Sequence, residues 1–442
     1  MKDPKKVVVD RKILVPFILI TSLFAMWGFA NDITNPMVAA FKTVMEISNA
    51  KAAMVQFAFY GGYATMAIPA ALIIKRYSYK LGIIIGLALY AIGALLFYPA
   101  AKFEIFGFFL VSLYILTFGL AFLETTANPY ILSMGAPETA TRRLNLAQSF
   151  NPVGSLLGMT VASQVVLPAL ISDERDAVGN LIFGSLSAAE KAGIRTHDLA
   201  TIRDPYVILG FVVIAMLFVI AFSKMPKRES ADHDIHTRDS FKRLYNNKVY
   251  RTGVIAQVFY VGAQIMCWTF IIQYAENLGL SKAVAQRYNI VAMVIFLSSR
   301  FISTALMKYL NARFMLMLFA VGGMLTITGV ILIQGMPGLY LLVATSAFMS
   351  LMFPTIYGIA LEDVGDDATL GAAGLVMAIV GGALLPMLQA KIIDIGGSGF
   401  SDIHVLGFIS EVNFSFILPL ICFVVIAAYG RNTYKAFKSK TA

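Results

Sequence analysis

Residues 105–134 read IFGFFLVSLYILTFGLAFLETTANPYILSM, a mostly apolar run in which Glu124 is the one charged side chain. A helix needs about 20 apolar residues, at 1.5 Å of rise each, to cross the hydrocarbon core of a bilayer. The run therefore predicts a membrane-spanning helix with one carboxyl group deep in its length. Its continuity argues against a transmembrane β-barrel, whose strands alternate apolar and polar residues.

The whole chain shares this apolar character. Of its 442 residues, 58% are hydrophobic and only 14% are charged, whereas soluble domains average about 45–50% apolar and 25% charged. This composition excludes disordered, collagen-like and disulfide-stapled chains, and it predicts an all-α integral membrane protein. The two cysteines, Cys267 and Cys422, lie in apolar runs, so we expect buried thiols.

Apolar runs of sufficient length predict twelve transmembrane helices, in two six-helix bundles of a single membrane protein. The predicted spans are 13–44, 51–75, 81–99, 105–134, 143–170, 204–224, 248–277, 284–309, 313–334, 338–361, 370–394 and 410–431. We expect the first to be an uncleaved helix rather than a signal peptide, because no convincing small-residue cleavage site follows its apolar run. The polar stretch at 171–203 is expected to be a loop.

A charged stretch divides the spans into two groups. We expect an N-terminal bundle at 1–224, a cytoplasmic linker at 225–247 and a C-terminal bundle at 248–442. Loops on one face carry 24 of the 35 Lys and Arg residues, and the positive-inside rule assigns that face, with both termini, to the cytoplasm. This bias accounts for the net charge of +10 and gives no reason to expect a nucleic-acid partner.

Two carboxyl groups lie well inside predicted spans, away from the span ends, where an ionised side chain costs several kcal/mol. We expect Glu124, the deepest, to carry a proton; a neutral, hydrogen-bonded structural glutamate is the alternative. Asp32 either faces the bundle interior or, if the first span ends near Ala30, sits at the outer surface. Pro36 is expected to break the helix locally.

Amide, hydroxyl and aromatic side chains recur at helical spacing in two spans. They are Asn145, Gln148, Ser149 and Asn151 in span five, and Gln257, Tyr260, Gln264 and Trp268 in span seven. Trp27 and Trp268, the two tryptophans, fall well inside spans rather than in interfacial belts. A neutral polyhydroxylated ligand, with its hydroxyls on amides and its ring on tryptophan, would explain these stripes. For any one residue, interhelical hydrogen bonding is the alternative.

The remaining charged features have structural interpretations. Arg300 in span eight is expected to snorkel or to pair with Glu362. The acidic loop 362–367 lacks Lys and Arg; it is expected either to pair with Lys308, Arg313 or Arg300, or to be a solvated turn. No catalytic or nucleotide-binding motif occurs in a suitable context, so the sequence predicts neither an enzyme nor a metal site.

Several segments match a known family. They are QFAFYGGY at 56–63, YSYKLGI at 77–83, LETTANP at 123–129, RLNLAQ at 143–148, YVGAQ at 260–264 with Trp268, and AFMS at 347–350 with Pro354. On these segments the chain resembles, over nearly its whole length, the L-fucose:proton symporters of the major facilitator superfamily.

The resemblance implies a twelve-helix major facilitator fold that imports a neutral monosaccharide, L-fucose first, with one proton by alternating access. It implies a bacterial-type inner membrane, the proton as coupling ion, no cofactor and no obligatory protein partner. By motif, Glu124 matches the family's coupling glutamate and Gln148 a sugar-binding glutamine. Other implied sugar-binding or cavity-lining residues are Trp27, Asn35, Asn128, Asn145, Tyr260, Gln264 and Trp268.

The chain departs from the family pattern in two places. Asn35 stands where the family has Asp, and Asp32, three residues earlier, stands where it has Asn. Because residues at i and i+3 share a helical face, Asp32 is expected to share the proton-coupling role. The segment before Lys80 lacks the Gly and Asp of the superfamily's loop motif. Alternative functions are transport of glucose, galactose or another hexose and, more remotely, a membrane receptor or enzyme.

Overall fold

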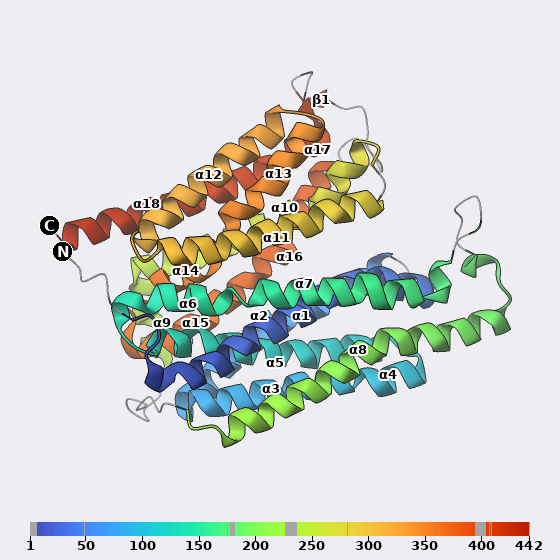
Figure 1. Cartoon of the computed structure of the whole chain (residues 1–442), viewed down its shortest axis with the longest axis horizontal. Coiled ribbons are helices and arrows are strands. Elements are labelled where there is room, and N and C mark those ends of the chain that lie inside the picture. Colours follow the sequence, from blue (N-terminus) through green and yellow to red (C-terminus); the bar gives the residue numbers. More distant parts are fainter. Residues whose placement is uncertain are drawn as a thin grey trace. The chain divides into compact units, whose positions relative to one another are not determined.

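The protein is almost entirely helical (Figure 1). Its structure, a computed structural model, describes residues 7–47, 49–174, 176, 182–225, 237–280, 282–393, 404–405, 407 and 409–441. Within these ranges, 12 helical segments are long and apolar enough to cross a membrane. The predicted all-α membrane fold and its number of spans are confirmed.

The first six spans are built from helices α1 to α8. Their bounds are α1 Leu14–Val44, α2 Asn49–Arg76, α3 Tyr79–Leu95, α4 Phe97–Phe103, α5 Phe106–Ser133, α6 Ala140–Gln148, α7 Asn151–Val161 and α8 Ala188–Phe222.

The second six spans follow the short helix α9. The bounds are α9 Thr237–Asn246, α10 Lys248–Asn277, α11 Lys282–Leu306, α12 Ala312–Leu332, α13 Met336–Met349, α14 Met352–Ala360, α15 Ala368–Met377, α16 Gly381–Ile393, α17 Glu411–Ser415 and α18 Ile417–Thr441. A short antiparallel pair, β1 His404–Val405 and β2 Ile409–Ser410, precedes α17.

Proline accompanies a break in some predicted spans and lies inside a continuous helix in others. Span five divides into α6 and α7 just before Pro152, and span ten divides into α13 and α14 just before Pro354. Proline lacks the N–H that would continue the helical ladder. The break expected at Pro36 is wrong, because α1 continues to Val44; membrane helices tolerate proline where neighbouring groups satisfy the freed backbone.

Helix α8 is longer than the predicted span 204–224. It begins at Ala188, inside the stretch expected to be a loop, with a capping box between Ser187 and Glu190. The two side chains satisfy backbone donors reciprocally and start a helix in polar sequence. Hydropathy located the apolar part of this helix and missed its polar first turns.

The chain forms two compact units. Unit 1 comprises Met1–Leu14, Asn128–Ser149 and Asp234–Ala442, and unit 2 comprises Val15–Ala127 and Phe150–His233. The predicted bundle at 1–224, linker at 225–247 and bundle at 248–442 stay predictions. Residues 226–236 of the linker lie outside the described residues, and α9 occupies most of the remainder.

Each unit is held by lengthwise helix packing. In unit 2, α8 lies along α3 and α4; in unit 1, α12 lies along α13 and α18, and α10 along α16 and α18 (Figure 1). In unit 2 the contact of α1 with α7 is so close that a Cβ on Gly154 would fall 1.8 Å from the Ala25 carbonyl oxygen. Small residues permit such backbone contact in membrane helices.

Two smaller expectations can be settled. Cys267 and Cys422 are free and buried, as predicted. In the acidic loop, Glu362 pairs with Arg313, whereas Asp367 accepts two hydrogen bonds, of 2.7 and 2.8 Å, from Arg243 of α9. Arg243 was not among the expected partners, because the sequence does not show that α9 folds back on this loop.

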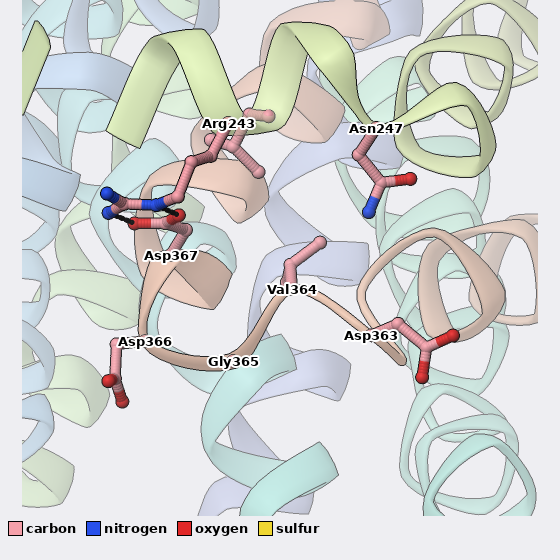
Figure 2. Close-up of a pocket in the computed structure, with 8 residues that line it drawn as sticks. Arg243, Asn247, Asp363, Val364, Gly365, Asp366 and Asp367 are labelled. Carbon is pink, nitrogen blue, oxygen red and sulfur yellow. Dashed lines mark hydrogen bonds and ion pairs between the residues drawn. The ribbon is translucent and has the colours of Figure 1, made fainter. Parts of the chain in front are cut away.

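The Arg243–Asp367 pair lines a cavity of about 340 Å³ between α9 and the loop (Figure 2). Asp363 and Asp366 also line it. The hydrogen bond to Asp367 raises the pKa of the Arg243 guanidinium. None of the predicted site residues lines this cavity, so we assign it a structural role in tying α9 to the loop.

Candidate functional site

Glu124 lies buried on α5, with 7% of its surface exposed. Tyr63 of α2 is close enough for the two side chains to interact electrostatically. Leu120, Leu123 and Ala127, its neighbours on the helix, are fully buried. An ionised carboxyl group is costly in such a dry setting, so the charge of Glu124 can respond to whether water reaches it.

Asp32 lies half-buried on α1, in the same unit. Asn31 Nδ2 donates to its carboxylate at 3.4 Å, and the Ser155 hydroxyl of α7 also bonds to it. Ser155 is within reach because Gly154 and Gly158 bring α7 against α1. The helix itself does not end near Ala30, since α1 runs on to Val44; a position of Asp32 in the bundle interior stays a prediction. The donors that the described residues offer Asp32 are neutral.

Two further predicted residues belong to α1. Trp27 is only 4% exposed, and its ring centroid lies 4.2 Å from that of Phe24. The side chain of Asn35 lies outside the described residues, although the helix passes through this position. A role for either residue in sugar binding stays a prediction.

Unit 1 brings together three of the predicted amides. Gln148 Nε2 donates to Asn128 Oδ1 at 2.8 Å, and Asn145 Nδ2 donates to the Thr355 hydroxyl at 3.2 Å. All three amides are buried. The stripe predicted for span five is interrupted, however, because the helix breaks after Gln148 and the Asn151 amide donates to the Phe24 carbonyl oxygen at 3.2 Å.

The stripe predicted for span seven lies on one continuous helix, α10. Gln257 is fully buried, and neither its amide oxygen nor its nitrogen has a hydrogen-bond partner among the described residues. Trp268 Nε1 donates to the Ser346 hydroxyl at 3.2 Å, while Gln264 is half-buried. Buried polar atoms are normally satisfied, so Gln257 indicates a place for water or for ligand hydroxyls.

Arg300 of α11 is the functional candidate that sequence reasoning missed. It neither snorkels nor pairs with Glu362: it is 3% exposed and its guanidinium lies 4.4 Å from the Phe296 ring centroid. It interacts with Tyr260, and Phe296 meets Trp268 edge-on at 4.9 Å. The snorkelling interpretation failed because α11 turns this side chain toward protein rather than toward the membrane surface.

Arg300 also reaches the backbone beside the amide pair. Its Nη1 donates to the Gln148 carbonyl oxygen at 3.0 Å, and its Nε donates to the Ser350 carbonyl oxygen. The guanidinium thus connects the amide pair to Tyr260 and, through Phe296, to Trp268. Within the described residues no group of three or more His, Cys, Asp or Glu side chains is placed to hold a metal ion.

Comparisons with known proteins identify the family of the chain. The profile described as Major Facilitator Superfamily matches residues 18–386. The chain is 68% identical over 433 residues to the L-fucose-proton symporter of Haemophilus influenzae, covering 98% of this chain and 99% of that protein. It is 30% identical to a glucose/galactose transporter of Brucella abortus biovar 1, covering 93% of this chain and 92% of that protein.

A solved structure gives the same result. The chain superposes on a crystal structure of a major facilitator superfamily transporter, FucP, in the outward conformation, with a TM-score of 0.85 and 31% identity. The match covers 96% of this chain and 99% of that one.

Proposed function

Because the chain belongs to the major facilitator superfamily, and within it to the family of the L-fucose–proton symporters, we propose that it imports L-fucose together with a proton. The observation that carries the proposal is on α5, where the buried carboxyl of Glu124 lies one turn before Asn128, which accepts the hydrogen bond of Gln148. One helix therefore links a protonatable group to a buried amide pair suited to a sugar hydroxyl.

The proposed transport cycle depends on the free-energy cost of burying an ionised Glu124. Glu124 takes up a proton while the site is wet and open to the outside, and the sugar then binds. With the carboxyl neutral and the hydroxyls paired with amides, the occluded site holds no unpaired charge. Opening to the inside lets water return, the sugar leaves and the proton follows. The proton gradient thereby drives accumulation by alternating access.

Each side chain of the proposed site has its own role in binding the sugar. Gln148, Asn128 and Asn145 take sugar hydroxyls, and Trp268 offers a ring face, held at its Nε1 by Ser346. Tyr260, Gln264, Trp27 and Asn35 complete the set that the family resemblance predicts. Asp32 is proposed to share proton transfer with Glu124.

We also propose a bacterial inner-membrane location with both termini in the cytoplasm. The bias of Lys and Arg toward one set of loops supports this orientation. L-fucose itself rests on the similarity to a protein of that name at 68% identity, and a hexose remains the second candidate because a glucose/galactose transporter is 30% identical.

Transport by the purified protein in vesicles tests the proposal. Labelled L-fucose should accumulate when the outside is acidic, an uncoupler should abolish accumulation, and preloaded unlabelled sugar should drive counterflow. A panel with D-glucose and D-galactose measures preference, because L-fucose lacks a hydroxyl at carbon six. Accumulation of a hexose in preference to L-fucose would change the substrate. Absence of counterflow with every sugar would favour a receptor or an enzyme.

A further inference from the structure

Arg300 is a buried side chain with a permanent positive charge, and the groups that it contacts are uncharged. An arginine side chain cannot be deprotonated under physiological conditions, and among the described residues no carboxylate forms an ion pair with it. Two of its hydrogen bonds go to backbone carbonyl oxygens, those of Gln148 and Ser350, and its side chain also interacts with Tyr260. These two oxygens belong to different spans, at the C-terminal ends of α6 and α13.

Both carbonyl groups lie four residues before a proline. In an α-helix the C=O of residue i accepts from the N–H of residue i+4. Residue i+4 is Pro152 for Gln148 and Pro354 for Ser350, and proline has no N–H to donate. Each break therefore leaves a carbonyl oxygen that would be unsatisfied in a dry interior, and Arg300 donates to both.

We propose that Arg300 is a positioning residue that replaces the two backbone donors removed by Pro152 and Pro354, and so fixes the broken ends of spans five and ten together. Its planar guanidinium suits this task because its N–H groups diverge in a rigid fork. Lysine, whose ammonium is a compact point charge on a flexible stem, cannot reproduce that fork.

This role bears on the sugar site, and to that extent it rests on the proposed function. Gln148 is held at its carbonyl oxygen by Arg300 and at its side-chain amide by Asn128. Phe296 lies between the guanidinium and Trp268. Removing the guanidinium of Arg300 should therefore loosen both Gln148 and Trp268. This effect requires no contact between Arg300 and the sugar.

Proline removal supplies the decisive experiment. In full-length protein in detergent, Arg300→Met should raise the Kd for L-fucose by about tenfold, the scale of a lost charged hydrogen bond, and lower the unfolding midpoint measured without sugar. Adding Pro152→Ala restores the backbone N–H, so that the helix can satisfy the Gln148 carbonyl itself. It should recover a clear part of both losses, and Pro354→Ala should act additively.

Pro69→Ala is the matched control, because Pro69 is an exposed proline inside α2, a helix that Arg300 does not cap. It should rescue neither measurement. Three results would overturn the proposal. Pro69→Ala could rescue as well as Pro152→Ala does, Pro152→Ala could fail to rescue, or Arg300→Met could leave both the Kd and the midpoint unchanged. If the unfolding midpoint recovered but the Kd for L-fucose did not, Arg300 would stabilise the fold without positioning the sugar-binding residues.

A milder variant and a sugar-free measurement complete the experiment. If Arg300→Met does not insert, Arg300→Lys provides a milder background for the same proline series. If wild-type protein does not bind L-fucose, the proposed function fails, whereas the sugar-free midpoints still decide whether Arg300 replaces the missing donors.

Discussion

Two buried polar regions of the molecule handle charge in opposite ways. In unit 2, Asp32 receives hydrogen bonds from neutral donors, Asn31 and Ser155, and Glu124 lies among apolar side chains of α5. In unit 1, Arg300 keeps a charge that cannot be removed and donates hydrogen bonds to two carbonyl oxygens. The first region can change its charge by gaining a proton, whereas the second cannot. We infer that the first region couples proton transfer to sugar transport, and that the second holds the sugar-binding side chains in position.

The largest effect should come from fixing the charge of the first region. Glu124→Gln keeps the shape of the side chain and removes its ability to gain and lose a proton. We expect uphill accumulation of L-fucose to fall to background while counterflow, which needs no net proton movement, is retained. Both are measured in vesicles with an imposed pH gradient.

The matched control is Glu411→Gln on α17, a buried carboxyl 4% exposed that lies outside the predicted site. It should leave accumulation near the wild-type level. Accumulation by Glu124→Gln at the wild-type level would show that coupling does not depend on this residue.

Asp32 tests whether one carboxyl or two are needed. We expect Asp32→Asn to abolish proton-driven uptake, and the exchange of the two residues, Asp32→Asn with Asn35→Asp, to restore part of it. The reason is that positions 32 and 35 share a face of α1 one turn apart. Initial uptake rates under a pH gradient give the measurement. Normal uphill transport by Asp32→Asn alone would leave Glu124 as the single coupling group.

The predictability of the two regions differs for a physical reason. A carboxyl in an apolar run is costly wherever it faces, so Glu124 and Asp32 stand out from the sequence alone. The helix count and the stripe on α10 follow from apolar length and period. Arg300 was misjudged because an arginine near a span end can snorkel, and only the fold shows which way it turns. Yet the pairs Gln148–Pro152 and Ser350–Pro354 already marked carbonyl groups in need of a donor.

Ring platforms should give a smaller, graded effect. Trp268 is half-buried and tied to Ser346, whereas Trp27 is 4% exposed and packed on Phe24. We expect Trp268→Ala to weaken L-fucose binding by about 1–3 kcal/mol, as for an anchor in a small site, and Trp27→Ala to weaken it as well. Trp268→Phe, which keeps a ring face, should lose less. Unchanged Kd in both alanine variants of folded protein would assign the tryptophans to packing.

The smallest effect should come from a carboxylate that does have cationic partners. Glu46 follows α1 and receives hydrogen bonds from Lys191 at 2.7 Å and from Arg195 at 3.1 Å. The Lys191 hydrogen bond, with the positive charges of both partners, holds the pKa of the Glu46 carboxyl below its usual value of 4.5. Because Glu46 is exposed, salt screens these pairs and their net worth is small.

We therefore expect Glu46→Gln to leave uphill transport unchanged and to lower the unfolding midpoint by at most about 2 °C at neutral pH. A pKa lowered by folding contributes stability above the unfolded-state pKa and loses it as the pH falls through the folded-state value. The midpoints of wild type and variant should thus converge once the pH falls below the lowered folded-state pKa of Glu46, and also in high salt. Loss of proton-driven accumulation in Glu46→Gln, as in Glu124→Gln, would show that the proton path reaches this surface carboxylate. Coupling would then not be confined to the buried carboxyl groups of unit 2.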